Sequence, residues 1–363
     1  MSSVPTYFSD FISNIRLPDE LRAELQNAHK ELRERLNSDP ITSDLMVDSF
    51  LQGSYARATC IKPEASGKVD VDVIAVTNIN HQLTKPSEAF DQVMPFVEKY
   101  YDNFQQQKRS IGISLPKVDI DLVITAAPSE EVIQELRSAN LSCAFTIEDL
   151  NIRHAPAYRA DSLYDFFRSD GAMKKWRSEP LLIPDSEDDQ WHKTHPLEQI
   201  RWTRDKNKNC NGHYVNVVKA VKWWKRVNLP DLKHPKSYPL EHFVGQCCPD
   251  GITSVAEGIT LAFEKIVQSY PTKPFLPDHG VPEHDVFESL TEEAYQAFYC
   301  AVKKFAPIAR AAFNSSDIGE SVKLWQSFFG NCDEFPEYHG PSVSNGFTPR
   351  TQKAESIPTG RFG

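Results

Sequence analysis

The sequence predicts an α+β protein of two lobes, in which a mixed-sheet lobe precedes a helical lobe. Short runs that alternate aliphatic and polar residues, typical of strands, gather in the first 127 residues. Apolar residues at helical spacing dominate the second half, and a stretch rich in Pro, Ser, Asp and Glu, residues 177–196, separates the two patterns as a predicted loop. We therefore expect one lobe over 1–190, a second over 191–337, and a disordered C-terminal tail over 338–363.

The first lobe is predicted to hold a long N-terminal helix, then strands and a second helix. Leucines recur at helical spacing over 17–36 with charged residues between them, and Pro18 and Pro40 flank the pattern. The chain pattern further predicts strands at 50–52, 70–77 and 117–127, a helix at 87–104, a short helix at 133–139, and short strands at 145–147 and 151–152. Because a helix lies between two of the strands, the order of elements favours a sheet packed against helices.

The second lobe is predicted to be helical. Apolar residues with a period near that of a helix predict helices over 211–227, 239–247, 253–270, 291–313 and 318–329. Residues 269–282 contain four prolines and are predicted to form a loop between two of these helices. Aromatic residues of the last helix, such as Trp325 and Phe328, are expected in the core of this lobe.

The charge and the apolar pattern exclude some classes of function. With a formal net charge of −10, the chain does not resemble a protein that binds long nucleic acid over its whole surface, so no DNA partner is expected. No apolar run is long enough to span a bilayer, and residues 1–16 lack the pattern of a secretory signal, so no membrane partner is expected. Seven scattered cysteines, an odd number, suit a reducing compartment and predict a cytoplasmic protein.

Four side chains of the second lobe are of types that bind zinc: Cys210, His213, Cys247 and Cys248. The two halves of this set lie 34 positions apart, and the usual C-x₂-C spacing is absent. Buried thiols without a metal are the simpler interpretation, and a zinc site stays open as the alternative.

Carboxylates occupy one face of two predicted strands. Asp70 and Asp72 lie two apart on the first strand, and Asp119 and Asp121 lie two apart on the second, each alternating with aliphatic residues. One such strand would be interpreted as the solvated face of a sheet. Two of them within about fifty residues favour a site for a divalent cation such as Mg²⁺, because gathered carboxylates repel one another unless a cation neutralises them.

A Gly-Ser pair precedes these strands. Gly53 allows the backbone to approach a phosphate closely, and Ser54 offers a hydroxyl beside its own backbone N–H. The pair alone is a weak signal. When the two acidic strands follow it in the sequence, the Gly-Ser pair favours a nucleoside triphosphate as the ligand.

The stretch 52–59, followed by Asp70, Asp72 and Asp121, resembles the active site of the nucleotidyltransferase superfamily. Within it, the chain most resembles the bacterial cGAS/DncV-like nucleotidyltransferases, which make cyclic oligonucleotide second messengers in antiphage defence. The resemblance implies a two-lobed nucleotidyltransferase fold, with the helix at 17–36 as a spine and the active site in the cleft between the lobes. The gap between the Gly-Ser pair and the first acid is longer than in the general pattern and fits the cyclic-oligonucleotide branch.

The resemblance also implies roles for single residues. It implies that three residues, Gln52, Gly53 and Ser54, bind the nucleotide, and that three others, Asp70, Asp72 and Asp121, are catalytic and hold two Mg²⁺ ions, for which Mn²⁺ can substitute. The third acid of the family precedes an aliphatic pair, which fits Asp121-Leu122-Val123 better than Asp119, although Asp119 shares the same face. The substrates implied are nucleoside triphosphates, ATP among them, which are joined into a cyclic di- or trinucleotide with release of pyrophosphate.

In the second lobe, Lys222 on a predicted helix and the stretch 236–241 resemble the family's Lys-x-Trp helix and its Ser-Tyr-x-Leu-Glu segment. The resemblance implies that Lys222 and Ser237 hold the triphosphate of the donor nucleotide, and that Tyr238 stacks on a base. From the sequence alone, Lys222 is equally compatible with a solvated lysine on a surface helix.

Two other kinds of function stay open. One is a nucleotidyltransferase that makes linear oligonucleotides or extends RNA, against which the acidic charge counts. The other is an inactive nucleotide-binding module on the same fold, against which the complete acidic set counts. Some relatives lie beside ubiquitin-transfer-like enzymes, and the tail that ends at Gly363 has the small terminal residue that such an enzyme would require, so this class of enzyme is an expected partner.

Overall fold

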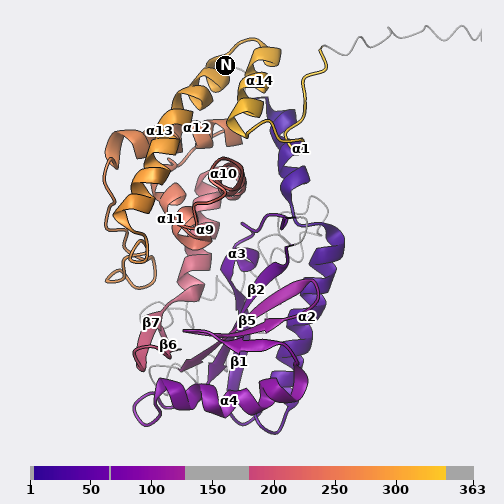
Figure 1. The fold of residues 1–363 in the computed structure, drawn as a ribbon, viewed down its shortest axis with the longest axis vertical. Helices are drawn as coiled ribbons and strands as arrows, with labels where there is room; N and C mark the ends of the chain where they lie inside the picture. Colours follow the sequence, from indigo (N-terminus) through magenta and orange to yellow (C-terminus); the bar gives the residue numbers. More distant parts are fainter. Residues whose placement is uncertain (1–3, 65–66, 127–179, 341–363) are drawn as a thin grey trace, which may run out of the picture.

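The computed structural model describes residues 4–64, 67–126 and 180–340, which form a sheet-containing lobe and a helical lobe stacked end to end (Figure 1). Each lobe has its own cluster of buried apolar residues, one including Val71 and the other including Trp224. The predicted α+β class, with a sheet lobe followed by a helical lobe, is confirmed.

The sheet is mixed, as the order of elements predicted. Its main path runs β1 (Met46–Gln52), β2 (Val69–Thr77), β5 (Val118–Ala126), β4 (Ile111–Ser114) and β3 (Phe104–Gln106). β2 and β5 are parallel, while β1 and β4 are antiparallel to their neighbours on this path. In the parallel pair, Asp70 lies opposite Asp119. Asp72 lies opposite Asp121, so the predicted carboxylates are neighbours on adjacent strands.

Two helices pack on the sheet lobe. α2 (Asp19–Ser38) runs along one side of it and α4 (Pro86–Tyr100) lies across its lower end (Figure 1). Three leucines of α2 are fully buried in the same core as the sheet: Leu25, Leu32 and Leu36. The long N-terminal helix is therefore confirmed. α4 ends before the predicted residue 104, because Phe104 already pairs with Ile113 of the neighbouring strand.

The prediction of a loop over 177–196 is wrong, because this stretch contains a hairpin. β6 (Leu181–Asp185) and β7 (Gln190–Thr194) pair antiparallel, and β6 joins the sheet where Leu182 pairs with Ala126. Asp189 has a positive φ of 51° in the turn between the strands. Two short strands that pair on a sheet edge depend on a tertiary contact, which the polar local composition does not encode.

The helical lobe consists of α9 (Pro196–Asn209), α10 (Tyr214–Asn228), α11 (Ser237–Cys247), α12 (Val255–Ser269), α13 (Glu292–Asn314) and α14 (Ile318–Phe328). The last five match predicted helices to within a few residues. α9 was not predicted, because the face that it buries is largely polar and carries Gln199, Thr203 and Asn207. A periodicity of apolar residues cannot reveal such a helix.

The first helix, α1 (Pro5–Ile15), packs into the core of the helical lobe, although the boundary at 190 assigned it to the sheet lobe. The ring of Phe8 lies 5.0 Å from that of Trp325, and the ring of Phe11 lies 4.3 Å from that of Phe329. α1 packs in this lobe because its aromatic face contacts aromatic residues on and beside α14 (Figure 1). At the other end, Tyr338 also packs against this core, beyond the boundary expected at 337. The other predicted boundaries between the lobes and the tail stay predictions.

Among the described residues, no helix is long and apolar enough to cross a membrane. The elements predicted at 133–139, 145–147 and 151–152 lie outside the described residues, as does the tail from residue 341 onward.

Candidate active site

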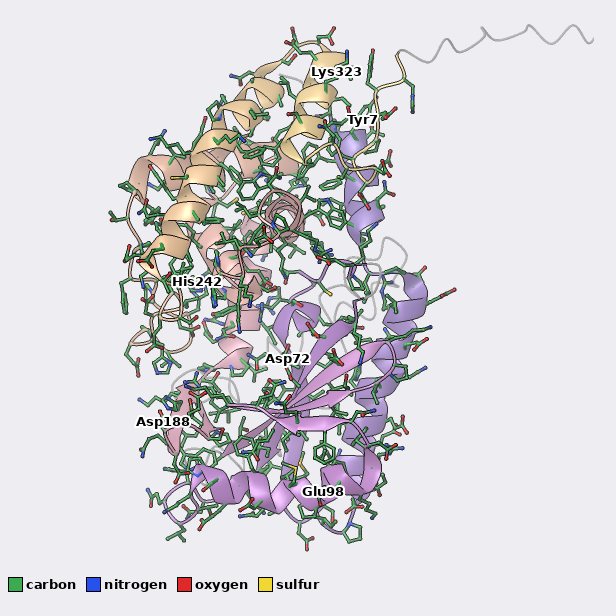
Figure 2. All side chains as sticks on the ribbon, in the orientation of Figure 1. Tyr7, Asp72, Glu98, Asp188, His242 and Lys323 are labelled. Atoms are coloured by element: carbon green, nitrogen blue, oxygen red, sulfur yellow. The ribbon has the colours of Figure 1, made fainter. Side chains whose placement is uncertain are left out.

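A cavity of about 800 Å³ lies between the two lobes, and all nine predicted site residues line it. These are Gln52, Gly53, Ser54, Asp70, Asp72 and Asp121 from the sheet lobe, and Lys222, Ser237 and Tyr238 from the helical lobe. Figure 2 shows Asp72 where the sheet lobe faces the helical lobe. The fold therefore brings together side chains that lie up to 186 positions apart in the sequence.

The carboxylates of the two adjacent strands raise the pKa values of the three cavity acids. Burial, and then the charge of Asp121, raises the pKa of Asp72 to about 6. Burial and the neighbouring carboxylates also raise the pKa of Asp70. The pKa of Asp121 is raised by burial and by the charge of Asp119, although Gln107 donates a hydrogen bond to Asp121 at 3.1 Å. Acidic groups that resist ionisation in one another's presence are the donor set that a divalent cation stabilises, so the residues fit such an ion.

Asp119, the alternative third acid, does not line the cavity. Its carboxylate accepts hydrogen bonds from Ser114 Oγ at 2.5 Å and from Lys68 Nζ at 3.3 Å. These partners already neutralise it in part. The geometry supports Asp121, which stays a prediction.

Gly53 opens the short helix α3 (Gly53–Ala56) directly against Asp72. Its φ is +78°, and a Cβ atom built on it would lie 1.7 Å from Asp72 Oδ2. The approach of a phosphate is one reason for a glycine at this position. The structure adds a second reason, because only a glycine leaves room for this carboxylate.

We therefore expect Gly53→Ala to displace Asp72 and lower the rate of the reaction by about 100-fold, since small displacements at a reacting centre cost about that much. Gly212→Ala is the matched control, because Gly212 has a φ of +80° and a Cβ atom added to it would meet no atom within 4 Å. The control experiences only the backbone strain, about 1 kcal/mol. Equal losses of activity in the two variants would contradict the steric explanation.

Lys222 is buried, so the interpretation as a solvated surface lysine is wrong. Its Nζ lies 2.7 Å from Glu241 Oε1 and donates to the carbonyl oxygen of Thr59 at 3.1 Å. The second oxygen of Glu241 accepts from Arg57 Nε at 2.9 Å. Although burial opposes ionisation, the two cations hold the pKa of Glu241 down at about 2. This network joins the lobes, because Arg57 follows α3 and Glu241 lies on α11.

No role was predicted for Arg57 or Glu241. Both lie inside the stretches that carried the family resemblance, 52–59 and 236–241. Their opposite charges inside these two stretches were the available signal. What pairs them is the contact between lobes, which sequence spacing does not show.

The cavity is positively charged overall, in contrast to the protein. Its lining contains three carboxylates and seven cationic side chains, namely Arg57, Lys68, Lys222, Lys225, Arg226, Lys233 and Lys236. Lys225 is half-buried, and burial lowers its pKa; among the described residues it has no carboxylate partner within 4 Å. Cations gathered in a chain with a net charge of −10 indicate that the ligand is a polyanion.

The zinc alternative gains no support from the structure. Cys210, Cys247 and Cys248 are buried, and burial raises the pKa of Cys247 to about 12. In the part of the chain that the structure describes, one group of three metal-binding side chains has its ligand atoms within 4.8 Å of one another: Asp185, Asp188 and His192. Asp185 is already paired with Arg109 at 2.8 Å, so this group is explained as an ion-pair network at the β6–β7 hairpin.

The raised pKa of Asp72 predicts how the stability of the metal-free protein depends on pH. Between pH 3.8 and about 6 the folded protein keeps a proton that the unfolded chain has lost, so the free energy of unfolding falls as pH rises through this window. We expect a loss of about 2–3 kcal/mol from this group. Urea unfolding in EDTA at pH 4 and pH 7 measures it. Asp72→Asn should flatten the profile, and an unchanged profile in that variant would refute the assignment.

Two comparisons of sequence with known proteins agree with the geometry. A family model described as the Second Messenger Oligonucleotide or Dinucleotide Synthetase domain matches residues 1–129. The chain is 41% identical to a probable cyclic AMP-AMP-GMP nucleotide synthase of Salmonella paratyphi B, with 98% of each chain covered. It is 39% identical to the cyclic AMP-AMP-GMP synthase of Enterobacter hormaechei subsp. hoffmannii, again with 98% of each chain covered.

The fold is similar to that of Vibrio cholerae DncV cyclic AMP-GMP synthase in complex with nonhydrolyzable GTP. The TM-score is 0.61 at 13% sequence identity, and the match covers 90% of this chain and 95% of the other. At so low an identity the match shows the fold alone.

Proposed function

The chain belongs to the bacterial cGAS/DncV-like cyclic oligonucleotide synthases, and from this premise we propose that its product is a ring of two adenylates and one guanylate. The protein is a nucleotidyltransferase that joins nucleoside triphosphates into a cyclic oligonucleotide second messenger. The ring composition is proposed because two relatives of this name match along 98% of the chain. A role in antiphage signalling and a cytoplasmic location belong to the same proposal.

One observation carries the proposal at the level of residues: a single cavity joins three carboxylates of raised pKa to seven cations. A nucleoside triphosphate with its metal has the complementary charges, because cations contact the phosphates and carboxylates contact the metal. A surface for long nucleic acid would instead spread its cations over one face.

The residues of each lobe have different roles in the proposed reaction. Ser54 and the backbone at Gly53 hold the phosphates from the sheet lobe, while Ser237 and the third N–H of Lys222 hold them from the helical lobe. Tyr238 stacks on the base. Asp121 takes the proton of the acceptor ribose hydroxyl, which then attacks the α-phosphorus and expels pyrophosphate toward the cationic wall. Repetition of this step on the linear intermediate lengthens it and closes the ring.

Enzymes of this family use divalent metal ions, and the donor set of the cavity fits them. In our proposal Asp70, Asp72 and Asp121 hold two Mg²⁺ ions. When bound, these ions supply positive charge against the charge that develops on the phosphate oxygens.

Incubation of the purified chain with ATP, GTP, CTP, UTP and Mg²⁺, followed by phosphatase and mass spectrometry, tests the function. We expect a phosphatase-resistant product with the mass of a ring of two adenylates and one guanylate. A product that the phosphatase shortens would indicate a linear synthase. Binding of nucleotide without release of pyrophosphate would indicate an inactive module.

A protein partner is proposed for the C-terminus. A ubiquitin-transfer-like enzyme would join the carboxylate of Gly363 to another molecule, for which a terminal glycine offers little steric hindrance. We expect deletion of the last residues to leave the purified activity unchanged and to remove higher-mass conjugates from cells that contain the transfer enzyme. Product formation by the purified truncated chain measures the first effect, and mass spectrometry of protein captured from cells measures the second. Conjugates that persist after the deletion would disprove this role.

A further inference from the structure

A buried carboxylate lies behind the cavity and binds two of the side chains that line it. Asp278 Oδ2 accepts a hydrogen bond from the hydroxyl of Tyr238 at 2.6 Å and another from Gln199 Nε2 at 3.0 Å. Tyr238 and Gln199 line the cavity, whereas Asp278 is not among the described residues that do so. Its exposed fraction is 8%, and it comes from the connection between α12 and α13. Asp278, which is remote from both in the sequence, thus binds two side chains of the cavity wall, Tyr238 and Gln199.

The backbone fixes the direction of this carboxylate. Its other oxygen, Oδ1, accepts from the backbone N–H of Gly280 at 2.8 Å and of Val281 at 3.2 Å. The backbone N–H of Asp278 donates to the carbonyl oxygen of His284 at 2.9 Å. With both oxygens engaged, the side chain cannot rotate without losing hydrogen bonds on each side.

The loop that carries Asp278 is docked against the start of α9. A Cβ atom on Gly280 would lie 2.2 Å from His195 Cβ, so a glycine is required for this approach. The ring of His279 lies between those of Trp202 and His242, 3.8 Å from each. Burial lowers the pKa of His279 to about 3 and that of His242 to about 4, so both rings are neutral. Within the described residues, no cation lies within 4 Å of Asp278 to compete with Tyr238 and Gln199.

An ionised carboxylate only accepts hydrogen bonds, which determines how its two partners are oriented. Gln199 must donate through Nε2, so its carbonyl oxygen Oε1 is the end directed to Gln52, another lining residue, from whose Nε2 it accepts a hydrogen bond at 3.4 Å. The hydroxyl of Tyr238 must donate as well, which fixes the ring whose face lies 4.9 Å from the guanidinium of Arg57. The cavity therefore presents a fixed acceptor beside a fixed aromatic ring.

We propose that Asp278 is a positioning residue for base recognition: it holds the Gln199 carbonyl oxygen to accept from the exocyclic amino group of an adenine base, and it holds Tyr238 to stack on that base. This inference rests on the proposed function of the cavity. A misplaced or rotated amide would present N–H groups to the base instead and would remove the preference for an amino substituent.

The test compares ATP with purine riboside triphosphate, which lacks only the amino group. Binding of each to the full chain in Mg²⁺ is measured by calorimetry, and turnover is measured at constant GTP. We expect the wild type to prefer ATP. Asp278→Asn accepts through one oxygen only, so we expect KM for ATP to rise about tenfold and the preference for ATP to fall by a similar factor, with a smaller change in kcat.

Asp285→Asn is the matched control. Asp285 lies in the same loop and accepts from the backbone N–H groups of Leu276 and Phe287, each at 2.9 Å, but it is not among the described residues that line the cavity. Its replacement makes the same chemical change in the same loop, keeps an oxygen for both hydrogen bonds and touches neither Tyr238 nor Gln199, so both ATP preference and KM should stay unchanged. Equal shifts in the two variants would reduce Asp278 to a structural role and overturn the inference.

Two further results keep the inference separable from folding and from the proposed function. If Asp278→Asn does not fold, Tyr238→Phe removes one of the two bonds and keeps the ring, and it should raise KM by a smaller factor; no change would count against the inference. A wild type that binds ATP no tighter than purine riboside triphosphate overturns the inference. A wild type that prefers ATP in binding yet makes no cyclic product overturns the proposed function alone and supports the inference.

Discussion

Replacement of Asp70 and Asp72 together by Asn is expected to reduce product formation by on the order of 10³-fold or more, while the fold stays intact. Both carboxylates line the cavity beside Asp121, and desolvation together with the charges of neighbouring carboxylates raises the pKa of each. Their removal deletes ligands for the metal and at the same time relieves repulsion in the metal-free protein. We therefore expect the free energy of unfolding near pH 7 to stay equal or to rise by about 2–3 kcal/mol. Pyrophosphate release and urea unfolding measure the two effects.

Two single variants separate the third acid from its neighbour. Asp121→Asn should be as inactive as the double variant, because Asp121 faces the cavity opposite Asp72. Asp119→Asn should keep its activity, because Asp119 does not line the cavity and its carboxylate already accepts hydrogen bonds from Ser114 and Lys68. The reverse pattern would move the third site to Asp119. A double variant that releases pyrophosphate at the wild-type rate would disprove the metal site altogether.

Glu241→Gln is expected to destabilise the protein by about 3–5 kcal/mol, the largest effect on folding that the site predicts. Glu241 is the common partner of Arg57 and Lys222, and the three side chains are buried between the lobes. A glutamine has the same shape but leaves two buried cations without a counter-charge. The free energy of unfolding from urea titration at pH 7 measures the loss.

The control for this variant is Glu283→Gln. Glu283 pairs with Lys193 at 3.4 Å, and both side chains are more than half exposed, so its replacement should leave the free energy of unfolding almost unchanged. The cation side of the network has its own test. Lys222→Met keeps the bulk of the lysine and leaves Glu241 paired with Arg57, so it should lose less stability than Glu241→Gln, but it should raise KM for nucleotide by about 10- to 100-fold. Equal stability of the glutamine variants at 241 and 283 would show that the buried network contributes nothing.

Lys222 shows where sequence reasoning about the site was incomplete. The resemblance identified it as a phosphate ligand, and the structure places it on the cavity wall. Its pairing with Glu241 means that a change at this position affects folding as well as binding. An ion pair in which Arg57 and Glu241 lie 184 positions apart leaves no periodic trace in the chain.

The sequence by itself determined the class of fold, most helices and the position of the acids. It could do so because these depend on local periodicity: alternation fixes which strand residues share a face, and the spacing of leucines fixes the buried side of α2. Tertiary structure alone decided the placement of α1 in the helical core, the hairpin formed by β6 and β7, and α9 with its polar buried face. It also decided that Asp278 lies behind Tyr238. Each of these depends on a partner from a distant part of the chain, and the energy of such contacts is set by the packing of both partners rather than by the pattern of either.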